Sequence, residues 1–200
     1  MTLDRYRSVA DRLLTPWVSA AVKLGLSPDQ VSLLAFVAAL LAAGAFAVAE
    51  PVSYVAGGVL VLLNGWLDLV DGALARERGT DSKGGDLLDH VLDRYADIAI
   101  IAGFTVGIDA YALGFLAVTG VLMTSYLGTQ IQAVGIGREY GGLLGRADRL
   151  ALMGAVGIVA AVYPDPIVGD YSVVALLLVL FAAVGHLTAL QRFLGAWRDL

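Results

Sequence analysis

The stretch "DLVDGALARERGTDSKGGDLLDHVLD", residues 68–93, holds six Asp residues and one Glu between two strongly apolar runs. Carboxylates are costly to desolvate and repel one another when crowded, so this gathering requires an explanation. Asp68 and Asp71 are three residues apart, and Asp89 and Asp93 are four apart. Residues at these spacings share one face of a helix. Because the loop between the two pairs is short, we expect their helices to be antiparallel neighbours that aim four carboxylates at one small volume.

The composition of the chain indicates a membrane protein. Of the 200 residues, 58% are hydrophobic and 16% are charged, whereas soluble domains carry about 25% charged residues. Apolar runs long enough to cross a bilayer, which takes roughly 20 residues, recur along the sequence. The chain has no Cys, which excludes disulfides and thiolate metal sites. The charged N-terminal segment "MTLDRYRSVADRLL" has no uninterrupted apolar core, so we do not expect a cleavable signal peptide.

We therefore predict an all-α, polytopic membrane protein that forms a single domain over residues 1–200. Residues 1–26 are predicted to form an interfacial amphipathic helix region, because apolar residues recur there at helical spacing and charged residues fall on the opposite side. Within this region, Thr15 and Pro16 are expected to restart the helix, and Gly25 is expected to end it.

Residues 27–200 are predicted to form a six-helix transmembrane region. Its start is marked by "SPDQ", in which Ser27 is the expected N-cap, Pro28 the first helical residue and Gln30 the second member of a capping box. The six spans are expected near residues 31–49, 53–75, 87–107, 110–133, 149–163 and 171–192.

The basic residues predict the orientation of these spans. The loops near residues 50–53, 108–110 and 164–170 share one side and contain acidic residues but no Lys or Arg. The positive-inside rule makes the opposite side cytoplasmic. Both termini and the acidic stretch are therefore expected to face the cytosol of a prokaryotic cell.

Four crowded carboxylates need positive charge to offset them. Oxygen ligands without Cys or a run of His suit Mg²⁺ or Mn²⁺, and two divalent cations would balance four carboxylates. Such a site at a membrane surface indicates phosphoryl chemistry. Asp81 and Asp86 are interpreted as solvated charges. An ion-coupled transporter is the alternative from another class, but transporter acids usually lie near mid-membrane, whereas these gather at one end of the spans.

Eight residues in the same stretch carry a resemblance to a known family. The pattern DxxDGxxARx8Gx3Dx3D is reproduced without a gap by Asp68, Asp71, Gly72, Ala75, Arg76, Gly85, Asp89 and Asp93. It is similar to the signature of the CDP-alcohol phosphotransferase family, whose helical layout the chain also resembles over nearly its whole length. The resemblance implies an enzyme that moves a phosphatidyl-type group from a CDP-linked lipid to an alcohol and releases CMP. It also implies a homodimer.

The resemblance further implies roles for individual residues. The metal ligands would be Asp68, Asp71, Asp89 and Asp93, and Asp93 would also be the catalytic general base. The CDP-lipid would be bound by Asp29, Asp68, Gly72, Ala75, Arg76 and Gly85. Asp29 lies in "SPDQVS", which resembles the "TPNxxT" segment of many members, although a role in the helix cap is an equal alternative. For the small residues, helix packing is the alternative to contact with a ligand.

Four arginines indicate the acceptor. Arg138, Arg146 and Arg149 lie between the fourth and fifth spans, and Arg192 lies near the end of the sixth. If they converge, they form a pocket for a phosphorylated acceptor; anchoring to anionic headgroups is the alternative.

The runs "GRADRL" and "GDLLDHVLDRYAD" resemble the inositol-phosphate-using branch of the family, which makes phosphatidylinositol phosphate in bacteria or archaetidylinositol phosphate in archaea. Glycerol 3-phosphate is the alternative acceptor, because it is also an anion. The scarcity of Lys and the acidic outer loops are typical of a salt-adapted archaeon, in which the donor would be CDP-archaeol.

Overall fold

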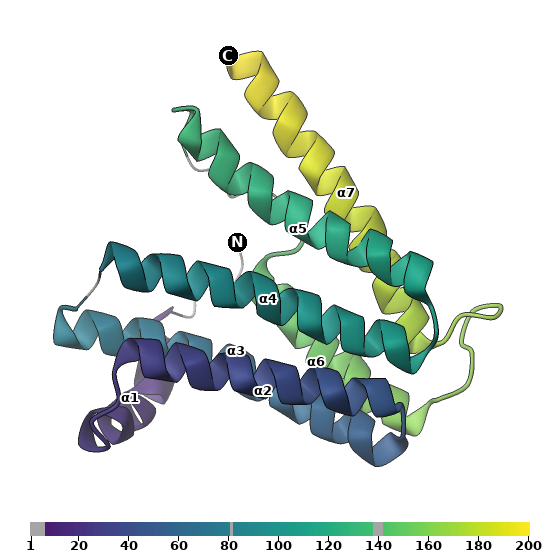
Figure 1. The fold of residues 1–200 in the computed structure, drawn as a ribbon, viewed down its shortest axis with the longest axis horizontal. Coiled ribbons are helices and arrows are strands. Elements are labelled where there is room, and N and C mark those ends of the chain that lie inside the picture. The colour runs from purple at the N-terminus through teal and green to yellow at the C-terminus, as the bar shows by residue number, and fades with distance from the viewer. Residues whose placement is uncertain (1–6, 81, 138–141) are drawn as a thin grey trace.

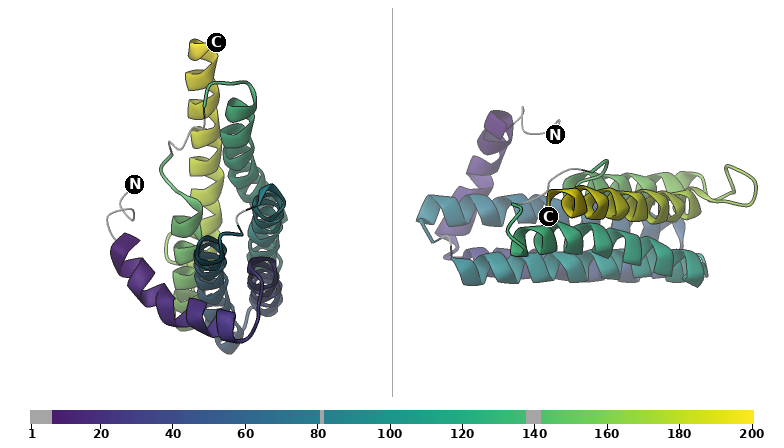
Figure 2. Two further views of the ribbon diagram at one scale, coloured as in Figure 1. Left: turned by 90° about the vertical axis from the view of Figure 1, so that its left-hand side faces the viewer. Right: turned by 90° about the horizontal axis from the view of Figure 1, so that it is seen from above.

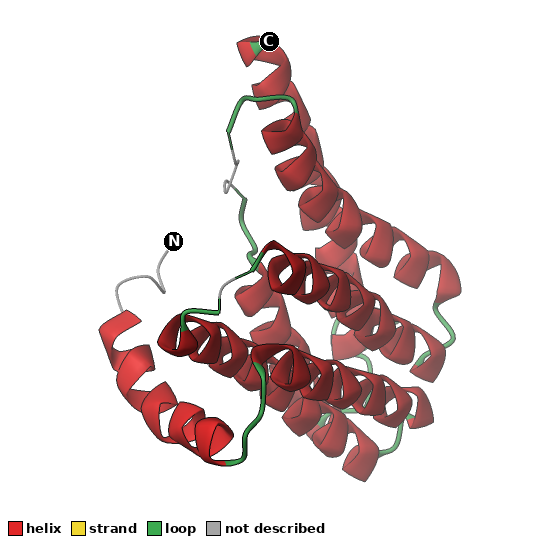
Figure 3. Cartoon of the chain, turned by 60° about the vertical axis from the view of Figure 1, so that its left-hand side comes forward, coloured by secondary structure: helices red, strands yellow, loops and turns green. Residues whose placement is uncertain are grey.

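The computed structural model describes residues 7–80, 82–137 and 142–200 (Figures 1 and 3). Within these residues every regular secondary-structure element is an α-helix, and the only β-type pairing is an isolated bridge between Val168 and Tyr171. The prediction of an all-α protein is therefore confirmed. The helices are α1 (Arg7–Lys23), α2 (Pro28–Val48), α3 (Pro51–Arg78), α4 (Lys83–Gly107), α5 (Tyr111–Ala133), α6 (Arg146–Val162) and α7 (Val173–Asp199).

Each of the six segments predicted as membrane spans forms one of the helices α2 to α7. Among the described residues, α2, α3, α5 and α7 are long and apolar enough to cross a membrane. The helix α4 carries several charges in its first half, and α6 has only 17 residues, or about 25 Å at 1.5 Å per residue. The chain is thus a helical membrane protein with four candidate spans by length and composition.

The start of α2 is fixed by the predicted capping box. The Ser27 hydroxyl accepts a hydrogen bond from the Gln30 backbone N–H at 3.2 Å, and the Gln30 side chain accepts one from the Ser27 N–H at 2.9 Å. These bonds satisfy two backbone donors that a helix start leaves open. They also place Asp29 in the first turn of α2, beside the start of α4.

The helix α1 continues through Pro16, so the predicted restart at Thr15 and Pro16 is wrong. Leu14 and Val18, on either side of the proline, are buried. They belong to an apolar cluster that also contains Ala21, Val31, Val70 and Leu74. This packing against α2 and α3 holds α1 together despite the hydrogen bond that proline cannot make.

Gly25 follows the end of α1, as predicted, and adopts a left-handed φ of +71°. The chain then turns into α2. Figure 2 shows α1 lying across the ends of the other helices rather than along them. This is the placement expected of a helix that rests at a membrane surface.

The helix α2 packs extensively against both α3 and α4, whereas α3 and α4 meet at most weakly. They run in opposite directions, as predicted (Figure 1), and their carboxylates meet at one end, but along their length each packs more closely against α2 than against the other. Small residues allow α2 to pack closely against α4: a Cβ at Gly103 of α4 would lie 2.3 Å from the Ala43 carbonyl oxygen of α2. Only glycine permits that approach. A short connection still keeps the end of α3 and the start of α4 together.

The remaining helices complete the bundle around this arrangement. The helix α5 packs along α7 through Gly120 and Gly185, and α6 packs against α3 through Gly58 and Gly154. The main apolar core contains Phe46, whose ring stacks on that of Phe104 at a centroid distance of 3.8 Å. The first residue of α6, Arg146, is thereby brought to the acidic end of α3.

Candidate functional site

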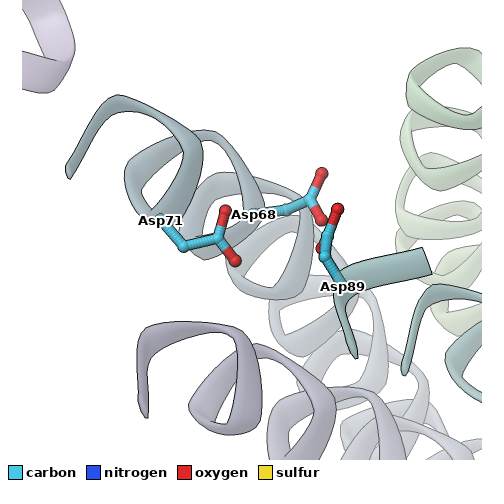
Figure 4. A group of neighbouring side chains, drawn as sticks. All are labelled: Asp68, Asp71 and Asp89. Atoms are coloured by element: carbon cyan, nitrogen blue, oxygen red, sulfur yellow. The ribbon is translucent and has the colours of Figure 1, made fainter. Parts of the chain in front are cut away.

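Three of the four predicted metal ligands converge. Asp68 and Asp71 of α3 and Asp89 of α4 each place a carboxylate oxygen within 4.8 Å of the other two (Figure 4). Asp71 is buried, while Asp68 and Asp89 are partly exposed. The Ser32 hydroxyl of α2 donates a 2.6 Å hydrogen bond to Asp71. The helix α2, which packs against both α3 and α4, therefore also holds one of the carboxylates in place.

The fourth carboxylate, Asp93, is held by an arginine. The Arg146 guanidinium at the start of α6 lies 2.8 Å from an Asp68 oxygen and 2.7 Å from an Asp93 oxygen. It thus bridges α3 and α4 through charge-assisted contacts, which are stronger than neutral hydrogen bonds. The second Asp93 oxygen lies 3.6 Å from the Arg94 guanidinium.

A buried ion pair lies one helical turn further along α4. Arg149 donates a 2.9 Å hydrogen bond to Asp97, and both side chains are almost completely buried. Arg94 lies 3.9 Å from the same Asp97 oxygen and is hydrogen-bonded to the Ser125 hydroxyl of α5. Because Arg149 is buried against Asp97, it does not reach lipid headgroups. Headgroup anchoring is therefore excluded for this arginine.

Four of the predicted CDP-lipid residues line one cavity. Its volume is about 690 Å³, and Asp29, Gly72, Ala75 and Gly85 lie in its wall together with Asp71 and Asp89. The Arg76 guanidinium lies beside Gly72, because a Cβ on that glycine would come within 3.4 Å of it. Asp68, the remaining member of the predicted set, lies next to this cavity in the carboxylate cluster.

The glycines of this cavity differ from those of the helix interfaces. A Cβ at Gly72 would contact only the flexible tip of Arg76, and one at Gly85 would meet only Ser82 and Asp29 side chains at 3.3–3.4 Å. Gly103, in contrast, touches the backbone of a neighbouring helix. Gly72 and Gly85 therefore keep cavity space open rather than allow two helices to pack.

Three of the four predicted acceptor arginines line a second cavity of about 780 Å³. They are Arg146, Arg149 and Arg192, which come from α6 and α7. Asp93, Arg94 and Tyr95 also lie in its wall. The predicted convergence of these arginines is thus found, while Arg138 lies outside the described residues. Arg192 also donates a hydrogen bond to the Thr124 carbonyl.

Three polar residues that contact or adjoin this site were not predicted from the sequence. They are Ser32, Arg94 and Asn64, whose side chain is buried one turn before Asp68 and donates a 2.8 Å hydrogen bond to the Ala35 carbonyl. A polar side chain inside an apolar helix is a signal that could have pointed to Asn64. Arg94 follows Asp93 directly in the sequence, but this position did not predict its contacts with Asp93, Asp97 and Ser125.

The donor set fits a divalent cation. The converging side chains offer carboxylate oxygens, the ligands that Mg²⁺ and Mn²⁺ prefer. The ion-pair network and the cluster contain Asp68, Asp71, Asp89, Asp93 and Asp97 against Arg94, Arg146 and Arg149. The carboxylates outnumber the guanidiniums by two, which leaves net negative charge for a cation to offset.

Residues 25–197 of the chain match the family model described as CDP-alcohol phosphatidyltransferase. The archaetidylinositol phosphate synthase of Methanothermobacter thermautotrophicus is 32% identical over 199 residues, covering 99% of this chain and 95% of that relative.

Two solved structures resemble the fold closely. The phosphatidylinositol phosphate synthase of Mycobacterium tuberculosis with CDP-DAG bound has a TM-score of 0.79 and 27% identity, covering 93% of this chain and 94% of that one. The same protein in complex with manganese and citrate has a TM-score of 0.78 and 25% identity, covering 92% and 88% respectively.

Proposed function

Because the chain belongs to the CDP-alcohol phosphatidyltransferase family, we propose that it transfers a phosphatidyl-type or archaetidyl group from a CDP-linked lipid to the hydroxyl of inositol phosphate. CMP is the second product. The observation that carries this proposal is that two large cavities both border the carboxylates: Asp71 and Asp89 line the first, and Asp93 lines the second. A donor in one and an acceptor in the other would have their reacting groups side by side.

The CDP-lipid is assigned to the cavity of about 690 Å³. Gly72 and Gly85 leave room there for close approach of a ligand, and Arg76 lies beside Gly72. The guanidinium suits a diphosphate, because its planar fork binds phosphate oxygens in pairs. The bound CDP-DAG of the mycobacterial relative supports a donor of this class.

Asp68, Asp71 and Asp89 are proposed to hold divalent cations, with Asp93 as the fourth ligand once its present ion pairs open. Two ions, Mg²⁺ or Mn²⁺, are proposed because four carboxylates must be balanced; the manganese bound to the mycobacterial relative supports this class of cation. Such cations offset the charge that develops on the diphosphate during phosphoryl transfer.

The acceptor is assigned to the cavity of about 780 Å³, in which Arg146, Arg149 and Arg192 would bind its phosphate. The acceptor hydroxyl oxygen forms a new bond to the lipid-bearing phosphorus, and the bond from that phosphorus to CMP breaks. Asp93 takes the hydroxyl proton as general base. Arg138 stays a predicted member of the phosphate site.

We also propose that all six helices α2 to α7 cross the membrane within one domain. The helix α4 places Asp89 in the cluster at one end, and at the other a Cβ on Gly107 would lie 2.3 Å from the Phe46 carbonyl oxygen near the end of α2. The helix α6 runs from Arg146 at the cluster to Gly157, which lies against the Phe46 ring. Both helices therefore run from the carboxylate cluster to the level of Phe46, near the far end of α2. By the positive-inside rule we propose that the cluster faces the cytoplasm.

Glycerol 3-phosphate remains the competing acceptor, because a pocket of arginines binds any phosphate monoester. Inositol phosphate is preferred because the relatives named above are an archaetidylinositol phosphate synthase and a phosphatidylinositol phosphate synthase. The transporter alternative has no support from the family match. A homodimer stays a prediction that rests on the family likeness.

The proposal is tested by measuring CMP release from purified protein supplied with Mg²⁺ or Mn²⁺ and either CDP-diacylglycerol or CDP-archaeol. Inositol phosphate should support release, whereas glycerol 3-phosphate and serine should not. Asp89→Asn should lose release, while Asp109→Asn, the same change at an exposed site outside the cluster, should retain it. Folded protein that releases no CMP with any acceptor would rule out the transferase, and release with glycerol 3-phosphate alone would change the acceptor.

A further inference from the structure

Arg146 occupies a position that conflicts with the roles of its neighbours. Its two terminal nitrogens lie 2.8 Å from Asp68 and 2.7 Å from Asp93, so it pairs with one carboxylate of the converging trio and with the fourth carboxylate. With Arg94 beside its second oxygen, Asp93 has a guanidinium near each oxygen. Both Asp93 oxygens are therefore engaged by guanidinium groups, and Arg146 has to leave before the oxygen it holds can contact a cation or an acceptor hydroxyl.

The same side chain also borders the acceptor cavity. Arg146 lines that cavity with Arg149 and Arg192. Arg149 is committed to Asp97, which lies outside the converging trio. Among the arginines that line this cavity, Arg146 is therefore the one with a described ion pair to the converging trio, through Asp68.

The hydrogen bonding of the Arg146 side chain is incomplete. Its Nε atom is buried and has no hydrogen-bond partner among the described residues, and a buried donor without a partner is unfavourable. The side chain stands on the first residue of α6 and follows Gly145. Its long stem can move the guanidinium without any displacement of the helix.

We propose that Arg146 alternates between two positions: without a cation it bridges Asp68 and Asp93, and when cations occupy the carboxylates it turns into the acceptor cavity and receives the acceptor phosphate. The proposal deepens the proposed function and rests on it for the identity of that phosphate. Occupation of the carboxylates then releases Asp93 from Arg146 and prepares the acceptor site in one event. By thermodynamic linkage, cation and acceptor each strengthen the binding of the other.

The first test measures Mn²⁺ affinity by the electron paramagnetic resonance signal of free Mn²⁺, without donor or acceptor. Arg146→Gln removes the competing guanidinium and should bind Mn²⁺ at least about fivefold more tightly than the unchanged protein, the lower end of typical coupling. Arg198→Gln is the matched control, since Arg198 is exposed near the end of α7 and lines neither cavity, and its Mn²⁺ affinity should change by less than about twofold.

The second test needs no substitution and follows the side chain itself. Phenylglyoxal modifies accessible arginines, and mass spectrometry of peptides measures modification at each one. Addition of Mn²⁺ should raise modification of Arg146, and inositol phosphate should lower it again. Arg149, which stays paired with Asp97, should not respond to Mn²⁺.

Unchanged modification of Arg146 on adding Mn²⁺, or an Arg146→Gln variant that binds Mn²⁺ no more tightly, would overturn the proposal. Neither measurement depends on turnover. Failure to release CMP would reject the proposed function, while these two measurements would still decide the behaviour of Arg146. Inositol phosphate that leaves the modification of Arg146 unchanged would refute the acceptor cavity as its second position.

Discussion

Asp93 is the residue on which the proposed chemistry depends most directly, because it lines the acceptor cavity at the carboxylate cluster. Asp93→Asn removes the proton acceptor but keeps the size of the side chain. CMP release should fall by about 10²–10⁴-fold, the usual contribution of a general base. Binding of the CDP-lipid should persist, since the residues lining the donor cavity are unchanged.

The measurement pairs CMP release with a direct binding assay for the CDP-lipid. Asp109→Asn provides the control, because Asp109 is exposed and outside the cluster. An Asp93→Asn protein with turnover close to that of the unchanged protein would remove Asp93 from the role of base.

The Asp97–Arg149 pair is predicted to stabilise the fold. Asp97→Asn leaves a buried guanidinium without its opposite charge, and breaking a buried pair in this way costs about 3–5 kcal/mol. Replacing both partners, as Asp97→Leu with Arg149→Met, removes the unpaired charge and should restore part of the loss.

Thermal unfolding of the single and double variants in the same detergent measures this coupling. The double variant should be less destabilised than the sum of its single changes. Additive losses would show that the two side chains contribute independently, despite their 2.9 Å contact.

For individual residues, spacing along the sequence predicted which side chains gather but not how they pair. The positions of Asp68, Asp71 and Asp89 followed from helix periodicity. The bridge from Arg146 to Asp68 and Asp93 did not, because it joins three helices whose rotations about their own axes the sequence does not specify. Contacts between residues far apart in the chain were missed for the same reason, the bond from Ser32 to Asp71 among them.

Among the helices, α2 has the largest effect on the geometry of the site, because it packs against both α3 and α4. A Cβ at Gly103 of α4 would lie 2.3 Å from the Ala43 carbonyl oxygen and 2.7 Å from its Cα. Since this neighbour is backbone, Gly103→Ala should destabilise the protein by about 1–3 kcal/mol through overpacking. CMP release should fall with it, because the start of α4 carries Asp89.

The matched control is Gly44→Ala in α2. A Cβ there meets no described atom within 4 Å, so the change should leave stability equal or raise it by about 0.5–1 kcal/mol through helix propensity. Thermal unfolding and CMP release, measured for both variants, test whether the close contact at Gly103 stabilises the protein. Equal effects at both positions would mean that the contact between α2 and α4 is looser than the structure indicates.

The helices themselves could be read from the sequence, but their contacts could not. Capping residues predicted the start of α2, and Gly25 predicted the end of α1. Pro16 gave a wrong prediction because tertiary packing outweighed the local preference of proline. The helix α2 is apolar on all sides, so its periodicity does not indicate which face meets α3 or α4, and its packing against both was not predicted.

For the molecule as a whole, charge is distributed unevenly between the two ends of the bundle. The carboxylate cluster and the arginines that pair with it lie at one end, where α3 ends and α4 begins. The connection between α6 and α7 lies at the other end and contains Asp165 and Asp170 but no Lys or Arg. The same asymmetry was visible in the sequence, because it depends only on the order of the loops.

The orientation of the protein in the membrane follows from this asymmetry and can be measured directly, because the chain has no Cys. Single cysteines introduced as Asp165→Cys and Leu200→Cys occupy exposed positions in the α6–α7 connection and at the C-terminus. By the positive-inside rule, a maleimide that cannot cross membranes should label the first variant in intact cells. It should label Leu200→Cys only after permeabilisation. Labelling of both in intact cells would place these positions on one side, which six spans do not allow, and the reverse pattern would put the carboxylate cluster outside the cell, away from cytosolic CDP-lipid and acceptor.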